Sequence, residues 1–126
     1  PWLMGGQLYS NLFLSGTDSA WFAETFGRRL CLDTSHSRLA ATHTGESFVE
    51  MIEHLAPHAG HLHLVDATGV DGEGVQVGRG DIDWKVLGAQ LEAMAPDVRF
   101  IPEIWQGHVD NGAGFWEALE QLESVL

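Results

Sequence analysis

The sequence predicts an α/β fold in which buried parallel strands alternate with helices. Three observations favour this fold. Short apolar runs have the character of buried strands, amphipathic helical patterns lie between them, and the order along the 126 residues is β-α-β-α-β-α. A helix between two strands provides the crossover that parallel pairing requires. A chain of this length fits one compact domain or a piece of a larger one.

The first half of the chain is expected to contain two helices around one strand. After an irregular stretch over residues 1–16, TDSAWFAETFG predicts a helix with Thr17 or Asp18 as N-cap and Gly27 as its stop. RLCLD then predicts a short buried strand that ends at the polar residues TSHS. In GESFVEMIEHLAPH the apolar residues recur at helical spacing and form one face. That face consists of Phe48, Met51, Ile52 and Leu55, and Pro57 closes the helix.

The second half repeats the alternation of strand and helix. GHLHLVDA, residues 60–67, predicts a strand, and TGVDGEGVQVGRGDI after it is too rich in glycine for regular structure. Asp83 is placed to cap the next helix. VRFIPEI, residues 98–104, predicts a third strand in which Pro102 marks a disturbed or terminal position. Apolar residues from Phe115 to Leu126 stripe a last helix.

Charge and composition exclude several classes of function. The net charge is -12 with a single lysine, Lys85, so the chain lacks the basic surface that binds nucleic acid or anionic lipid. No apolar run approaches the roughly 18–20 residues that a membrane span needs. The single cysteine, Cys31, excludes an internal disulfide, and its apolar surroundings predict a small buried side chain. This usage is compatible with the reducing cytoplasm, where we expect the protein.

Residues that bind metals stand where each predicted strand ends. Asp33 ends the first strand, with His36 one turn beyond; His63 lies near the end of the second; Glu103 ends the third. Parallel strands bring their carboxyl ends to one side of a sheet, which hosts the active site in α/β folds. We therefore expect Asp33, His63 and Glu103 to converge.

This set of residue types suits a divalent cation with open coordination positions. Mixed oxygen and nitrogen ligands favour Mn²⁺, Co²⁺, Mg²⁺ or Zn²⁺, whereas structural zinc sites favour thiolates. Each residue also has an ordinary structural interpretation. A strand-end aspartate is often a turn residue or a helix cap, and a lone histidine is often a core residue. Glu103 in an apolar stretch is harder to dismiss, because an unpaired buried carboxylate is costly. Together the three favour a metal site.

The motifs LCLDTSH, HLHLVDATGVDGEGVQVGRGDIDW and FIPEI resemble the last three βα units of the xylose isomerase-like (β/α)₈ barrels. This superfamily contains sugar-phosphate isomerases and epimerases, inosose dehydratases and endonuclease enzymes of the AP endonuclease family 2 type. The resemblance rests on an Asp-x-x-His, a His-x-x-Asp, a Gly-x-Gly before an aromatic residue, and a strand-end Glu. Those positions are filled by Asp33 and His36, His63 and Asp66, Gly78 and Gly80 before Trp84, and Glu103.

The resemblance implies that residues 1–126 are the C-terminal portion of such a barrel, roughly strands six to eight with their helices. It implies metal ligands at Asp33, His63 and Glu103, and a role for His36 as a second-metal ligand or a contact to substrate hydroxyls. The C-terminal EIWQGHVDNGAGFWEALEQL is also similar to barrels joined to sialic-acid-synthase-type domains.

Two departures from the family pattern limit what the resemblance implies. A complete barrel needs about 250 residues, and no convincing strand-five glutamate precedes Asp33 to act as the second acid or base. We therefore expect the missing barrel half, or a second copy of the chain, as a partner. The endonuclease-like branch carries further ligands before Gly78, where this chain has Gly72 and Gly74. Together with the acidic charge, this makes DNA repair a poor match.

The preferred interpretation is metal-assisted isomerisation or epimerisation of a sugar or sugar derivative. Glu103 is expected to move a proton at the carbon beside a carbonyl. Trp105 is a candidate wall of the sugar pocket, Arg79 a candidate partner for a substrate phosphate or carboxylate, and His108 a candidate residue of the rim. Each of the three has an ordinary structural alternative, as core or surface residue. Two other functions stay open: an inosose dehydratase-like lyase with the same ligands, and a catalytically incomplete barrel domain with a role in assembly.

Overall fold

The computed structural model describes residues 13–126, so residues 1–12 of the irregular stretch expected over residues 1–16 lie outside the described residues. Three parallel strands, β1 (Leu30–Asp33), β2 (Ala59–Leu64) and β5 (Phe100–Pro102), form a sheet of order β1-β2-β5. An antiparallel hairpin follows β2 and consists of β3 (Asp66–Thr68) and β4 (Gly72–Val75). The α/β class with parallel strands is confirmed, and the described strands form no closed barrel.

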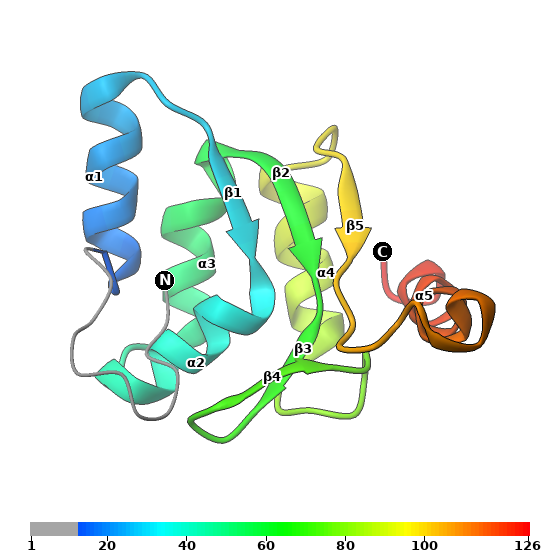
Figure 1. The fold of residues 1–126 in the computed structure, drawn as a ribbon. Coiled ribbons are helices and arrows are strands. Elements are labelled where there is room, and N and C mark those ends of the chain that lie inside the picture. The colour runs from blue at the N-terminus through cyan, green and yellow to red at the C-terminus, as the bar shows by residue number, and fades with distance from the viewer. Residues whose placement is uncertain (1–12) are drawn as a thin grey trace.

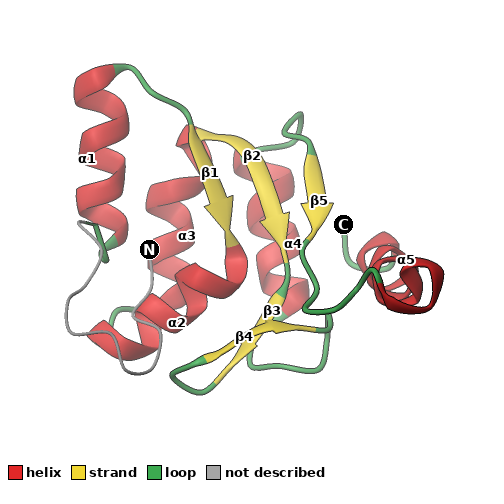
Figure 2. Ribbon diagram, viewed as in Figure 1, coloured by secondary structure: helices red, strands yellow, loops and turns green. Residues whose placement is uncertain are grey.

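Helices connect the strands and cover one side of the sheet (Figure 1). The helices are α1 (Gly16–Phe26), α2 (Thr34–Thr44), α3 (Phe48–Leu55), the 3₁₀ turn η1 (Ala56–His58), α4 (Trp84–Met94) and α5 (Val109–Glu123). α3 packs between α1 and α4, and the hairpin lies at the carboxyl ends of the strands beside α2 (Figure 2). The hairpin and the start of α2 therefore surround the edge where the predicted ligands lie.

The two faces of the sheet differ in burial. Leu32, Leu62 and Leu64 point toward the helices and are almost completely buried, in a core that includes Ile52 and Leu87. No helix formed by the described residues lies over the opposite face (Figure 1). It presents the intervening residues of the same strands: Cys31, Asp33, His61, His63 and Ile101, the last 45% exposed. Alternation along the strands thus separates an apolar core face from an open face with polar and ligand-type residues.

Most helix ends follow the sequence signals. Gly27 ends α1 in the left-handed conformation at φ 57°, and the Asp83 side chain accepts hydrogen bonds from two backbone N–H groups at the start of α4. The N-cap of α1 is Ser15, so the expected caps Thr17 and Asp18 were wrong by two to three residues. α5 begins with left-handed residues from Asp110 to Gly112 before regular helix follows.

Two elements were not predicted. TSHS was interpreted as a polar boundary, but it forms the first turn of α2, because the Asp33 side chain caps the helix and Leu39, Ala40 and Ala41 are buried. The glycine-rich loop was interpreted as irregular, but it contains the β3–β4 hairpin. The glycines there permit positive φ, in the turn at Gly69 and within β4 at Gly74, and do not prevent pairing.

Two predicted strands have other ends in the structure, and one predicted burial was wrong. β2 stops at Leu64 where the sequence predicted a strand to residue 67, and β5 covers only Phe100–Pro102 of the predicted 98–104. Cys31 was expected to be buried, but it is exposed because it points to the open face of the sheet. Side chains alternate between the two faces of a strand, and only one face of this sheet is covered by the described helices, which explains why Cys31 is exposed.

Candidate metal centre

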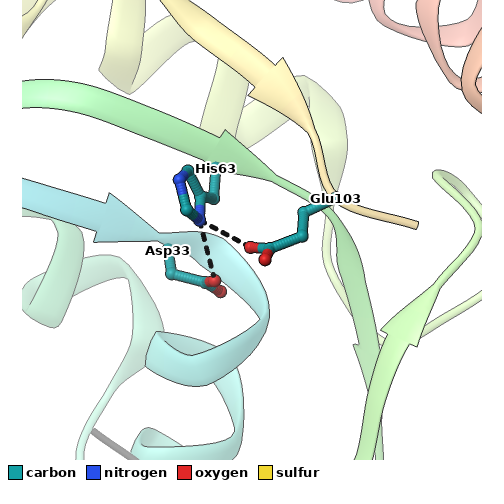
Figure 3. A group of neighbouring side chains, drawn as sticks. All are labelled: Asp33, His63 and Glu103. Atoms are coloured by element: carbon teal, nitrogen blue, oxygen red, sulfur yellow. Dashed lines mark ion pairs between the residues drawn. The ribbon is translucent and has the colours of Figure 1, made fainter. Parts of the chain in front are cut away.

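Three side chains converge at the carboxyl ends of the parallel strands. Asp33 and His63 are register partners at the ends of β1 and β2, and Glu103 directly follows β5. His63 Nδ1 lies 3.6 Å from Asp33 Oδ2 and 2.5 Å from Glu103 Oε2 (Figure 3). The middle strand thus holds the imidazole between two carboxylates that come from the strands on either side.

The donor set fits a divalent cation. Within residues 13–126, no other group of three or more His, Cys, Asp or Glu residues has its ligand atoms within 4.8 Å of one another. Asp33 and His63 are half-buried and Glu103 is exposed, which leaves the cluster accessible from one side. Two carboxylate oxygens and one imidazole nitrogen match the mixed ligand set preferred by Mn²⁺, Co²⁺, Mg²⁺ or Zn²⁺. Acidic groups also cluster without a cation, so metal binding here remains a prediction.

Asp33 has two roles at the junction of β1 and α2. Its Oδ1 accepts a hydrogen bond of 2.9 Å from the backbone N–H of His36, which caps the helix. Its Oδ2 is turned toward the histidines, 3.6 Å from His63 Nδ1 and 3.5 Å from His36 Nδ1. The cap fixes the carboxylate in one orientation, and this orientation leaves Oδ2 available to a ligand.

The buried Thr34 connects the ends of the first two strands. Its hydroxyl donates to Val65 O at 2.7 Å and accepts from Val65 N at 3.0 Å. It also lies 3.2 Å from His63 O. These bonds supply partners for the backbone where β2 leaves the sheet, and they hold His63 opposite Asp33.

His36 contacts Glu73, a residue that the sequence analysis did not propose for the site. Its Nε2 lies 3.1 Å from Glu73 Oε2 on β4. No local pattern predicts this contact, although a three-residue loop that contains glycine, here residues 69–71 with Gly69 at positive φ, is typical of hairpins. His36 therefore lies beside the three-residue cluster but faces carboxylates from two elements, Asp33 and Glu73.

Two cavities border the cluster and share Asp33, His36 and Glu103. The larger, about 470 Å³, lies on the side of α1 and β1, and most of its other lining residues are apolar. The smaller, about 260 Å³, lies under the hairpin and is also lined by Ser35, Glu73 and Trp105. The cluster thus stands between an apolar and an acidic compartment, and it offers a substrate access from either side.

The remaining predicted substrate residues divide into two groups. Trp105 lines the smaller cavity and is 68% exposed, so the alternative of core packing does not hold for it. Arg79 forms an ion pair with Glu117 on α5, and His108 is exposed just before α5. Neither Arg79 nor His108 lines the two cavities. Their roles in substrate binding stay predictions.

Asp66 has a different environment from the cluster. It is fully buried, and its carboxylate accepts five hydrogen bonds of 2.8–3.1 Å. The donors are the backbone N–H groups of Ala67, Gly78, Gly80 and Ile82 and the indole N–H of Trp84. A Cβ atom at Gly80 would lie 2.3 Å from Asp66 Oδ1, so only glycine fits there. Asp66 therefore orders the loop that leads into α4.

Cys31 lies on the open face one row behind Asp33. Burial raises the pKa of its thiol, and the carboxylates of Asp33 and Glu103 raise it further. The thiol is therefore held in its neutral form, which is a weak nucleophile and a weak metal ligand. His61, its register partner, packs its ring edge-on against His63 with 5.4 Å between ring centroids.

Comparison with known proteins agrees with this arrangement. No helix within residues 13–126 is long and apolar enough to cross a bilayer. No curated protein matches the chain. The family model described as xylose isomerase-like TIM barrel matches residues 23–125, which includes all three strands and the whole cluster. The chain therefore belongs to the xylose isomerase-like TIM-barrel family.

Proposed function

We propose that this chain carries the metal-binding part of the active site of a sugar isomerase or epimerase. The observation that carries the proposal is the convergence of Asp33, His63 and Glu103 at the carboxyl ends of three adjacent parallel strands. The family includes sugar isomerases and epimerases. In α/β barrels the same end of the sheet holds the catalytic residues. Position, residue type and family thus support one interpretation.

Asp33, His63 and Glu103 would hold the cation, with His36 beside it as a further ligand or a contact to substrate hydroxyls. A bound divalent cation supplies a Lewis acid that polarises a carbonyl oxygen. Asp33 contributes an oxygen whose orientation the helix cap fixes, and His63 is held by the strand end that Thr34 secures. The protein therefore places the ligands before any cation arrives.

Glu103 is the candidate general base. Its Oε2 faces His63, and the described residues donate no hydrogen bond to its other oxygen. Its side chain is 53% exposed and borders both cavities. From there it would take a proton from the carbon beside the substrate carbonyl and return it to the neighbouring carbon in an isomerisation. In an epimerisation an acid on the opposite face of the substrate would supply the new proton. Trp105 supplies an apolar wall near this carboxylate.

The sheet offers edges for further strands. Within the described residues β1 and β5 each pair on one side only, and the open face carries the cluster. Unpaired strand edges attract partners. We propose that further barrel strands, from the same protein or a second copy, pair at these edges and supply the acid or base on the opposite face of the substrate. Without such strands the chain would be catalytically incomplete.

Deuterium exchange in the intact protein tests the proposal. With Mn²⁺ present, ketoses incubated in D₂O should incorporate deuterium at the carbon beside the carbonyl, and Glu103→Gln should abolish the incorporation. Removal of the metal with a chelator should have the same effect. Release of water from a cyclitol substrate in place of exchange would indicate the dehydratase-like alternative. Metal-independent exchange, or none with any sugar or cyclitol, would overturn the proposal.

A further inference from the structure

The charged side chains around the two cavities are almost all acidic. The smaller cavity is bordered by the carboxylates of Asp33, Glu73 and Glu103. The larger cavity shares two of these and adds an apolar wall that includes Phe22, Leu30 and Leu55. The histidines at the cluster, His36 and His63, each have carboxylate oxygens beside them. A substrate in either cavity therefore meets an excess of negative charge.

No basic side chain compensates for this charge. The chain contains six Lys and Arg residues, all within the part that the structure describes, and none lines either cavity. Arg79, in the glycine-rich loop, is paired with Glu117 on α5. The amino end of α2 points toward the cluster, but Asp33 caps it. A phosphate or carboxylate group on a substrate thus finds no cationic partner in this part of the site.

Glu73 is the carboxylate that borders the smaller cavity but not the larger one, and backbone contacts of the neighbouring Gly74 fix its position. Gly74 N donates to Ser35 Oγ at 3.4 Å, and Trp105 N donates to Gly74 O at 2.8 Å. A Cβ atom at Gly74 would lie 2.8 Å from the Cβ of Trp105, so hairpin and loop are in close contact. The hairpin therefore joins α2 to the loop after β5 and holds the Glu73 carboxylate over the cavity.

Resting on the proposed function, we infer that the substrate is an uncharged sugar or cyclitol, and that Glu73 excludes phosphorylated and carboxylated relatives. Ionised carboxylates only accept hydrogen bonds, and the hydroxyls of a neutral sugar donate them. A divalent cation would balance Asp33 and Glu103, and Glu73 would remain as net negative charge. The charge of a phosphate ester would face that carboxylate across a small cavity, where repulsion is weakly screened.

Matched substrate pairs test this inference in the intact protein with Mn²⁺. Free ketoses such as D-fructose are compared with their phosphate esters, with solvent deuterium incorporation as the measurement. We expect kcat/KM for the neutral sugar to exceed that for its ester by roughly 100-fold. Glu73→Gln should reduce this preference by about tenfold, the effect of about 1.4 kcal/mol. Asp71→Asn removes the same charge from the exposed tip of the same hairpin and should leave the preference unchanged.

The outcomes separate the inference from the function on which it rests. Equal or faster exchange with the phosphate esters overturns the inference and leaves the isomerase or epimerase proposal intact. No exchange with any member of either set overturns both. Glu73→Asp keeps the negative charge, so it should keep the preference even if Glu73→Gln disturbs the hairpin. A preference that survives Glu73→Gln in the folded protein would overturn the assignment of Glu73.

Discussion

Asp33 is the last residue of β1 and Asp66 comes two residues after the end of β2, yet their carboxylates lie in opposite environments. Asp66 is completely buried, and five N–H donors from the loop at 67–84 occupy both of its oxygens. Asp33 is half-buried; one oxygen caps α2, and the other faces His36 and His63. The two aspartates belong to motifs of similar appearance, but they have different hydrogen-bond partners.

The difference shows how a structural carboxylate is distinguished from a candidate ligand. Asp66 has two hydrogen bonds to Oδ1 and three to Oδ2, so its acceptor sites are filled by the protein. Asp33 Oδ2 and Glu103 Oε2 accept no hydrogen bond from a described backbone N–H group, and these two oxygens meet at one imidazole. Carboxylate oxygens whose hydrogen-bond partners come from the protein stabilise the fold. Oxygens that lack such partners and lie close together form a candidate binding site.

The largest expected effect is the loss of Asp66. Asp66→Ala would leave five N–H donors without their partner, and three of these hydrogen bonds are fully buried. We expect the free energy of unfolding to fall by about 4 kcal/mol or more. Urea denaturation followed by circular dichroism measures the loss. Asp81→Ala is the matched control, because its carboxylate in the same loop accepts one hydrogen bond, from Gly69 N at 2.7 Å, and is exposed. Similar losses in the two variants would contradict the structural role of Asp66.

The next effect is on metal affinity at the open cluster. Asp33→Asn keeps a good helix cap but removes the charge, and Glu103→Gln does the same for the other carboxylate. We expect each to weaken Mn²⁺ or Zn²⁺ binding by at least about 100-fold in calorimetric titration, with little change in stability without metal. Asp83→Asn is the control, since Asp83 caps α4 away from the cluster. Unchanged affinity in Asp33→Asn and Glu103→Gln would mean that the cluster is not the metal site.

A smaller effect connects the fold to the site. Thr34→Val preserves shape but removes the hydroxyl that serves the backbone of Val65, and we expect a stability loss of about 1–3 kcal/mol. Because His63 then loses its fixed position, metal affinity should also decrease. Thr34→Ser retains the hydroxyl and should restore most of both quantities. If Thr34→Val is destabilised but keeps its full metal affinity, the Thr34 hydroxyl does not position His63 for metal binding.

The smallest effect concerns the thiol behind the cluster. Burial and the carboxylates of Asp33 and Glu103 raise the pKa of Cys31, so at pH 8 the thiolate fraction is lower than that of a free thiol. Removing one carboxylate lowers this pKa and increases the thiolate. Glu103→Gln should therefore speed alkylation of the metal-free protein by iodoacetamide roughly threefold at pH 8, and the difference should vanish well above the pKa. A slower reaction in this variant would contradict the electrostatic link.

Much of the fold followed from local patterns. The three strands, the helices at 48–55 and 84–94, and the caps at Gly27 and Asp83 were predicted because each depends on neighbours within a few residues. Helix α2 was missed because its first turn is polar. Asp33 caps this helix, but the sequence interpretation favoured Asp33 as a metal ligand over its alternative as a cap. The hairpin was missed because the glycine content of this segment was interpreted as evidence against regular structure, although glycine is common in hairpin turns.

The candidate site was predicted in part. Strand ends placed Asp33, His63 and Glu103 together, because the carboxyl ends of parallel strands meet at one edge of the sheet. The contact of His36 with Glu73, 37 residues apart, depends on how the hairpin folds over α2 and has no local signal. The pairing of Arg79 with Glu117 likewise joins a loop to the last helix.

The sequence by itself determined the alternation of the three parallel strands with helices, the acidic charge, the family and the three residues that converge. These properties depend on residue type and on spacing along one strand or helix. Only the tertiary structure decided that N–H donors occupy both oxygens of Asp66, whereas a backbone N–H occupies one oxygen of Asp33. It also decided that Glu73 contacts His36 beside the cluster and that Cys31 is exposed. Such properties depend on which distant segments supply hydrogen-bond partners or shield a side chain from solvent, and these contacts form only when the chain packs.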